Sequence, residues 1–210
     1  MSGTRMTPVE LWIDVICPWC LIGLTRLQRA ADAVGLAPDI RLRAFRLHRD
    51  WPVDGMAWRD FQTCRNLSDA VFEHVAAVGR ADGLPFDFGR VARVPDTTAM
   101  HRILNAAARE RLALPVFGAM AEAYFFAGVN LADADSAVAA AVQGGMTREA
   151  AEHALASART LDAVIADEQE AQRLRVRGVP FLRVGDAIMA GAQPIGAYAD
   201  LLQRSRLPFP

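Results

Sequence analysis

The chain opens with alternating segments of strand-like and helix-like hydrophobic pattern. Residues 9–16 (VELWIDVI) are rich in β-branched and apolar side chains, which predicts a strand. Between residues 20 and 34 apolar residues recur at helical spacing, and Gly35 then predicts the end of a helix. Residues 40–47 alternate apolar and basic types, as a strand with one solvated face does. We therefore expect a strand–helix–strand unit by residue 47.

The middle of the chain has a different composition. Residues 57–167 are dominated by alanine, leucine and charged residues, which predicts several helices and almost no strand. Thr147 is expected to cap one of these helices. The strand pattern returns at residues 179–189, where Gly185-Asp186 predicts a hairpin turn, and residues 195–202 predict a closing helix.

These elements predict an α/β fold interrupted by a helical block. The expected parts are an N-terminal α/β part (1–56), a helical insertion (57–167) and a C-terminal α/β part (168–210). A chain of 210 residues with 52% hydrophobic content is large enough to bury a core.

Charge and hydropathy narrow the expected partners. Lys and Arg (23) nearly balance Asp and Glu (24), so we expect neither nucleic acid nor a membrane surface as a partner. The N-terminus has no apolar signal-peptide region, and no stretch approaches the ~20 apolar residues of a membrane span. The expected location is the cytoplasm.

Cys17-Pro18-Trp19-Cys20 lies where the first strand meets the first helix. The free N–H groups and positive dipole end of a helix stabilise a thiolate at the first cysteine, which makes Cys17 the expected nucleophile. Cys20, one turn later, can attack a mixed disulfide and release the substrate. Pro18 suits the first helical position, where its missing N–H is not needed.

Other uses of this cysteine pair remain open. A structural zinc ion would need about four ligands, and Cys64 has no neighbouring cysteine, so no metal is expected. The pair could also be inert and buried. Arg65 could activate Cys64, although a lone helix cysteine without a role is the more common case.

The sequence resembles the DsbA-like branch of the thioredoxin superfamily, in particular its FrnE-like and 2-hydroxychromene-2-carboxylate isomerase-like members. The resemblance covers nearly the whole chain. It rests on four motifs in order: Asp14-x-x-Cys17-Pro18-Trp19-Cys20-x-x-Gly23, Thr97-x-x-x-His101-Arg102, Gly178-Val179-Pro180-Phe181 and Gly191-Ala192-Gln193-Pro194.

The resemblance implies a thioredoxin-like fold with an inserted helical domain and a cis-proline facing the cysteines, a role that falls on Pro180. The backbone of Val179 could then pair with an extended substrate. His101 would line the cleft near the thiols, although a lone helix histidine is more often a hydrogen-bonded core or surface residue. Pro18 and Trp19 complete the expected substrate-binding residues.

Two enzymatic functions compete. The leading one is a cytoplasmic protein-disulfide oxidoreductase or isomerase that acts on protein or small-molecule thiols and disulfides and needs no bound cofactor. The alternative is a glutathione-dependent isomerase of aromatic substrates, in which glutathione is a co-substrate and Cys20 is dispensable. A binding protein with vestigial thiols is a third interpretation. The family resemblance also predicts a homodimer.

Overall fold

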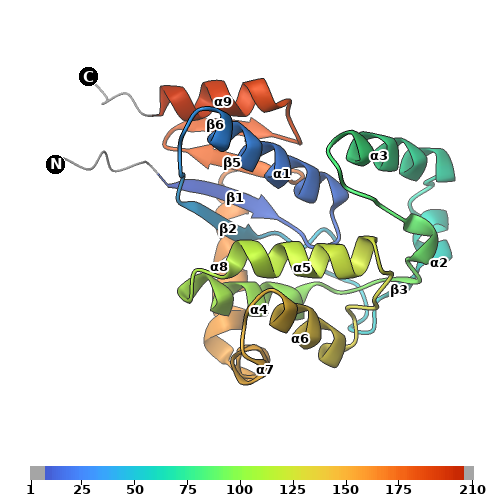
Figure 1. The fold of residues 1–210 in the computed structure, drawn as a ribbon. Helices are drawn as coiled ribbons and strands as arrows, with labels where there is room; N and C mark the ends of the chain where they lie inside the picture. The colour runs from blue at the N-terminus through green and yellow to red at the C-terminus, as the bar shows by residue number, and fades with distance from the viewer. Residues whose placement is uncertain (1–7, 206–210) are drawn as a thin grey trace.

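The computed structural model describes residues 8–205 and contains one main mixed sheet (Figure 1). Its strands are β1 (Val9–Ile13), β2 (Ile40–Ala44), β5 (Phe181–Val184) and β6 (Ala187–Ala190). They lie in the order β2–β1–β5–β6. β1 is parallel to β2 and antiparallel to β5, and β5 forms a hairpin with β6.

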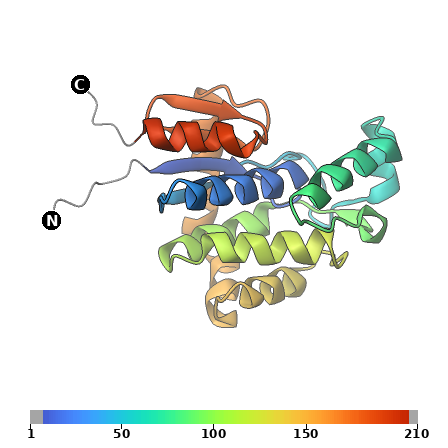
Figure 2. The same cartoon turned by 45° about the horizontal axis from the view of Figure 1, so that its top comes forward.

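Helices cover both faces of this sheet. α1 (Pro18–Ala33) and α9 (Ile195–Arg204) pack together on one face, and α8 (Ala158–Arg173) lies on the other (Figures 1 and 2). The remaining helices are α2 (Trp58–Cys64), α3 (Asp69–Ala81), η1 (Phe88–Arg90), α4 (Thr98–Arg109), α5 (Ala113–Phe125), α6 (Ala134–Gln143) and α7 (Arg148–Ala156).

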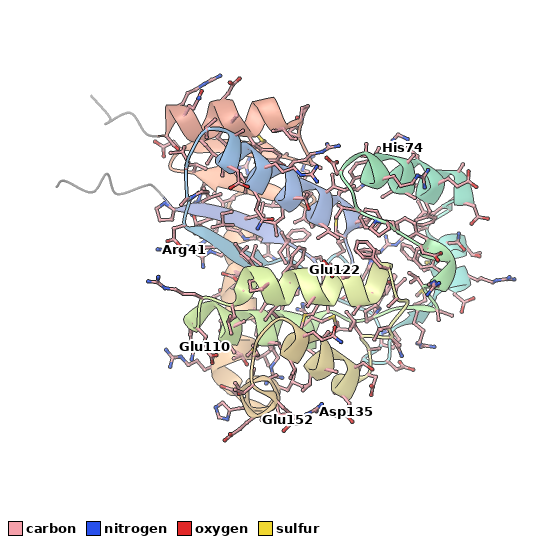
Figure 3. All side chains as sticks on the ribbon, viewed as in Figure 1. Arg41, His74, Glu110, Glu122, Asp135 and Glu152 are labelled. Atoms are coloured by element: carbon pink, nitrogen blue, oxygen red, sulfur yellow. The ribbon has the colours of Figure 1, made fainter. Side chains whose placement is uncertain are left out.

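α4 to α7 form a helical layer beside the sheet, and α3 lies at the end of β1 where α1 begins (Figure 1). α4 packs against α5, α7 and α8, so it occupies the middle of this layer. Charged side chains of the layer lie at its outer surface, as Glu110, Glu122, Asp135 and Glu152 show (Figure 3). A short pair, β3 (Met56–Ala57) and β4 (Arg93–Val94), ties α2 to the chain before α4.

β1 is buried on both faces, which explains its nearly continuous apolar sequence. Leu11 and Ile13 belong to the main core, whereas Trp12 points toward α8. The indole N–H of Trp12 donates to the carbonyl of Asp167 at 3.1 Å, and its ring packs edge-on against Phe181. The sheet is therefore held between two separate apolar clusters.

Most local expectations are confirmed. The Thr147 hydroxyl accepts a hydrogen bond from the N–H of Ala150 and caps α7, and Gly185 has a φ of 57° in the β5–β6 turn. β1 ends at Ile13, earlier than expected, because the chain turns at Asp14, and β2 ends at Ala44 where residue 47 was expected. The part boundaries at 56/57 and 167/168 stay predictions.

Gly23 allows α1 to approach the chain that enters β5. A Cβ atom at this position would lie 2.9 Å from Cγ of Pro180 and 3.2 Å from the hydroxyl of Tyr198. Pro180 and Tyr198 are buried, so neither can move into solvent without repacking. The distance between the helix that carries the cysteines and the Pro180 segment therefore depends on a glycine at position 23.

We predict that Gly23→Ala lowers the free energy of unfolding by about 1–3 kcal/mol through this overpacking, although alanine favours helix by about 1 kcal/mol. Gly118→Ala in α5 is the matched control, because a Cβ there meets nothing within 4 Å. It should stabilise the protein by about 0.5–1 kcal/mol. Urea denaturation of both variants provides the measurement, and equal effects would contradict the close approach.

Candidate active site

Cys17 is the N-cap residue of α1 and is held by the turn that ends β1. Its N–H donates to the carbonyl of Asp14 at 3.1 Å, and its backbone is extended, with φ of −94° and ψ of 107°. Pro18 follows in the first turn of the helix. This placement puts Cys17 at the N-terminus of a 16-residue helix, and its side chain makes no capping hydrogen bond there.

Cys20 lies one helical turn later and has no exposed surface, whereas Cys17 is 4% exposed. The N–H of Cys20 donates to the carbonyl of Cys17 at 2.9 Å, and both thiols are free. Burial raises the pKa of the Cys20 thiol well above its ordinary value, and interactions with the Cys17 sulfur and the Asp14 charge add to the increase. A substrate can therefore reach Cys17 before Cys20.

The segment before β5 faces the first cysteine. The Cys17 thiol donates to the carbonyl of Val179 at 3.4 Å, and the Val179–Pro180 peptide bond is cis. The Pro180 carbonyl accepts from the N–H of Gly191 at 2.8 Å, which extends the β5–β6 pairing toward the site. Val179 is half-buried and Pro180 is buried. Val179 and Pro180, which the sequence analysis expected to face the cysteines, thus lie beside Cys17.

Trp19, between the two cysteines, contacts the helical part of the chain. Its ring lies 6.3 Å from the ring of His74, centroid to centroid, and His74 belongs to α3 (Figure 3). Trp19 and Pro18 are both half-buried. α3 therefore forms one wall beside the cysteine motif.

A buried carboxylate connects the motif to the helical layer. Asp14 has no exposed surface, and its Oδ1 lies 3.2 Å from Nε2 of His101 in α4. Its Oδ2 accepts from the N–H of Leu47 at 2.8 Å, just beyond β2. His101, at 2% exposure, is therefore buried against Asp14, and its expected place in the substrate cleft stays a prediction.

Asp14 belongs to the motif that carries the family resemblance, but sequence reasoning gave it no role at the site. One signal was present, since Asp14 is one of only two acidic residues in the otherwise apolar segment 9–16. Periodicity alone does not show which distant groups bind such a carboxylate.

The loop after β2 carries an aromatic group that sequence analysis also missed. The rings of His48 and Trp51 stack at 3.7 Å with an interplanar angle of 4°, and Phe61 of α2 meets both edge-on. Burial lowers the pKa of His48 to about 4, with the charge of Arg65 adding to the decrease. The imidazole is therefore neutral at pH 7.

Arg65, at the C-terminal end of α2, binds this stacked pair. Its Nη2 donates to Nδ1 of His48 at 2.8 Å, and its guanidinium carbon lies 5.9 Å from the centre of the Trp51 ring. The neighbouring Cys64 is exposed, and its thiol donates to the carbonyl of Phe61 at 3.3 Å. Among the described residues, Cys64 makes no hydrogen bond with Cys17 or Cys20.

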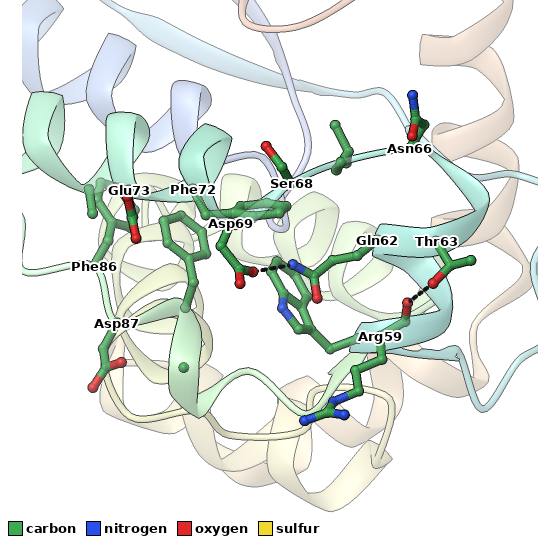
Figure 4. A pocket seen from close by; sticks show the side chains of 15 residues that line it. Arg59, Gln62, Thr63, Asn66, Ser68, Asp69, Phe72, Glu73, Phe86 and Asp87 are labelled. Atoms are coloured by element: carbon green, nitrogen blue, oxygen red, sulfur yellow. Dashed lines mark hydrogen bonds between the residues drawn. The ribbon is translucent and has the colours of Figure 1, made fainter.

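An open pocket lies between α2, α3 and η1 (Figure 4). Its volume is about 1080 Å³, and the rings of Trp58, Phe72 and Phe88 pack together in its wall. The Gln62 amide donates to the Asp69 carboxylate at 2.7 Å. Neither cysteine of the motif lines this pocket.

Residues 8–205 were compared with the requirements of a metal site and of a membrane-spanning helix. In that part of the chain, His, Cys, Asp and Glu form no group of three or more that could hold a metal ion. None of its helices has both the length and the hydropathy that crossing a membrane requires.

The chain matches the DSBA-like thioredoxin domain family over residues 8–203. This match and the sheet topology confirm the predicted thioredoxin-like fold class. A search of curated proteins found no match.

Solved structures are similar over nearly the whole chain. A probable DsbA oxidoreductase from Streptomyces coelicolor has a TM-score of 0.86 at 27% identity, with 97% of this chain and 93% of that one covered. A 2-hydroxychromene-2-carboxylate isomerase has a TM-score of 0.66 at 22% identity, with 93% and 94% covered. The cytosolic disulfide reductase DsbM from Pseudomonas aeruginosa, solved with GSH, has a TM-score of 0.65 at 18% identity, with 95% of each chain covered. The last two show likeness of fold alone.

We predict that Asp14→Asn lowers the pKa of the Cys20 thiol, because it removes a nearby negative charge that opposes the thiolate. The ¹³Cβ shift of Cys20 should be followed against pH in a Cys17→Ser background. Asp32→Asn, which removes an exposed carboxylate from the same helix, is the matched control. An unchanged midpoint in Asp14→Asn would show that this carboxylate does not act on the thiol.

We also predict that stability falls as pH drops from about 6.5 to about 4, since in this range the unfolded chain binds a proton at His48 that the folded chain does not. Solvent screening of this half-buried imidazole limits its share to about 1–2 kcal/mol. Urea denaturation of wild type and His48→Gln at pH 7 and 4.5 isolates the effect. The same pH dependence in both proteins would contradict it.

Proposed function

Because the chain belongs to the DSBA-like thioredoxin domain family, we propose that it is a cytoplasmic thiol-disulfide oxidoreductase with Cys17 as nucleophile and Cys20 as resolving thiol. One observation carries the proposal: the Cys17 thiol lies at a helix N-terminus, hydrogen-bonded to the Val179 carbonyl, with a second free thiol buried one turn behind it. This arrangement fits disulfide exchange in two successive steps.

In the first step, the Cys17 thiolate attacks one sulfur of a substrate disulfide. A bond forms between Cys17 and that sulfur, the substrate S–S bond breaks, and the leaving thiolate takes a proton from solvent. The helix N-terminus stabilises the thiolate before the attack. The product is a mixed disulfide at Cys17.

In the second step, Cys20 attacks the sulfur of Cys17, and its proton passes to the substrate thiolate that leaves. The Cys17–Cys20 bond forms, the second substrate thiolate leaves, and two electrons have passed from the dithiol to the substrate. The raised pKa of Cys20 keeps this thiol protonated until then. The contribution of the Cys17 sulfur charge is lost once that sulfur is bound in the mixed disulfide, so Cys20 ionises more readily when its attack is needed.

The residues around Cys17 would hold the substrate. The half-buried Val179 offers backbone to an extended peptide, beside the buried Pro180. Pro18 and Trp19 flank the thiol on the helix side. His101 acts through Asp14, so its part is to position that carboxylate, and contact with substrate is left to the other four residues.

No bound organic cofactor enters these steps. Glutathione is a suitable redox partner, and the similar DsbM structure was solved with GSH. The similarity to an isomerase supports glutathione-dependent isomerisation as a second candidate. Two intact cysteines favour the first candidate, since the isomerase would not need Cys20.

We predict that Cys17 and Cys20 form a reversible disulfide in glutathione redox buffers, with thiol states read by alkylation and mass. Cys20→Ser should trap a mixed disulfide at Cys17, because the resolving attack is lost. Cys64→Ser is the control background, since it removes the exposed third thiol. If the pair stays reduced throughout, the redox function is wrong, and isomerase activity that survives Cys20→Ser would establish the alternative.

A further inference from the structure

The Arg65 guanidinium is held by the neutral His48 ring and the Trp51 ring, and it pairs with no carboxylate among the described residues. Other guanidinium groups near the site are neutralised: Arg26 lies 2.8 Å from Asp82, and Arg46 lies 3.0 Å from Glu168. Within the part of the chain that the structure describes, no carboxylate lies within 4 Å of Arg65, which has only His48 as a side-chain hydrogen-bond partner. The side chain is exposed. A positive charge is thus held in a defined place and remains available to an anion.

Arg65 and its partner lie at the edge of the sheet where Cys17 lies. β1 and β2 are parallel, so their C-terminal ends meet at one edge, and Cys17 follows β1 as His48 follows β2. Asp14 fixes the two segments together, since it accepts from Leu47 N–H and its own carbonyl accepts from Cys17 N–H. Leu47, the residue before His48, is therefore joined through Asp14 to the turn that holds Cys17, on the β2 side of β1, whereas Val179 lies on the β5 side.

His48 adds a second donor to this positive group. Its Nδ1 accepts from Arg65, so in the neutral ring the proton is on Nε2. Nε2 makes no hydrogen bond within residues 8–205 and is not fully buried, so it is accessible to solvent. The stacked Trp51 ring holds both groups in place.

We propose that Arg65 and His48 bind a carboxylate of an anionic thiol or disulfide substrate, of the glutathione type, while the sulfur of that substrate reacts at Cys17. This inference rests on the proposed function and names its small-molecule substrate class. A guanidinium gives a carboxylate two parallel N–H donors, and preorganisation against Trp51 reduces the ordering cost of binding. His48 Nε2–H supplies an additional donor.

The kinetic test compares disulfides that differ in charge. Reduced protein in the Cys64→Ser background is mixed with glutathione disulfide (anionic), bis(2-hydroxyethyl) disulfide (neutral) or cystamine (cationic). Arg65→Gln should slow oxidation by glutathione disulfide about tenfold and leave the rate with the neutral disulfide within about twofold. Arg59→Gln, an exposed arginine of the same helix, is the matched control and should change neither rate.

A binding test keeps the inference separate from the redox function. S-Methylglutathione, which cannot exchange disulfides, is titrated into the Cys17→Ser protein and followed by the Trp51 indole NMR signal. Binding should weaken about tenfold in Arg65→Gln, partly in Arg65→Lys, and as salt is raised. This result would support the site even if the redox titration failed.

Two results would overturn the inference. One is an equal loss of rate with neutral and anionic disulfides, which would mean that Arg65 affects Cys17 through the fold. The other is S-methylglutathione binding that is absent or unchanged in Arg65→Gln. Either result leaves the disulfide exchange at Cys17 and Cys20 intact as a separate finding.

Discussion

The Asp14 carboxylate is fully buried, and its two oxygens are bound by groups from distant parts of the chain. Leu47 N–H comes from the end of β2, and His101 comes from α4 in the helical layer. The Asp14 carbonyl meanwhile fixes Cys17. Removing the partner of a buried charge lowers the stability of a protein by about 3–5 kcal/mol. The contacts of Asp14 with Leu47, with His101 and with Cys17 are therefore kept together. The place of Cys17 relative to the helical layer follows from this constraint.

The same carboxylate also contributes to the environment of Cys20. Cys17 lies at the helix N-terminus, whereas Cys20 is fully buried, and burial, the Cys17 sulfur and the Asp14 charge raise the pKa of its thiol. Two chemically identical side chains three residues apart are thus placed in different environments. In the proposed disulfide exchange, this difference makes Cys17 the first thiol to react and Cys20 the second.

Sequence analysis predicted what local pattern controls. The β1–α1 junction, the Thr147 cap and the Gly185 hairpin each depend on a few neighbouring residues, and the family resemblance supplied Pro180. The missed features join residues far apart. Asp14 and His101 are 87 positions apart, and Arg65 reaches His48 across 17 positions and a change of direction. Single polar side chains leave no periodic signal, so only the folded chain reveals their partners.

The proposed function and the proposed anion site assign reactivity and selectivity to different segments of this protein. The thiols lie at the start of α1, and Val179 and Pro180 lie in the segment before β5, where the carbonyl beside Cys17 would recognise any extended chain. Charge recognition would come from His48 and Arg65, in the loop after β2 and at the end of α2. A substitution at Arg65 could therefore change which disulfides react without altering how they react.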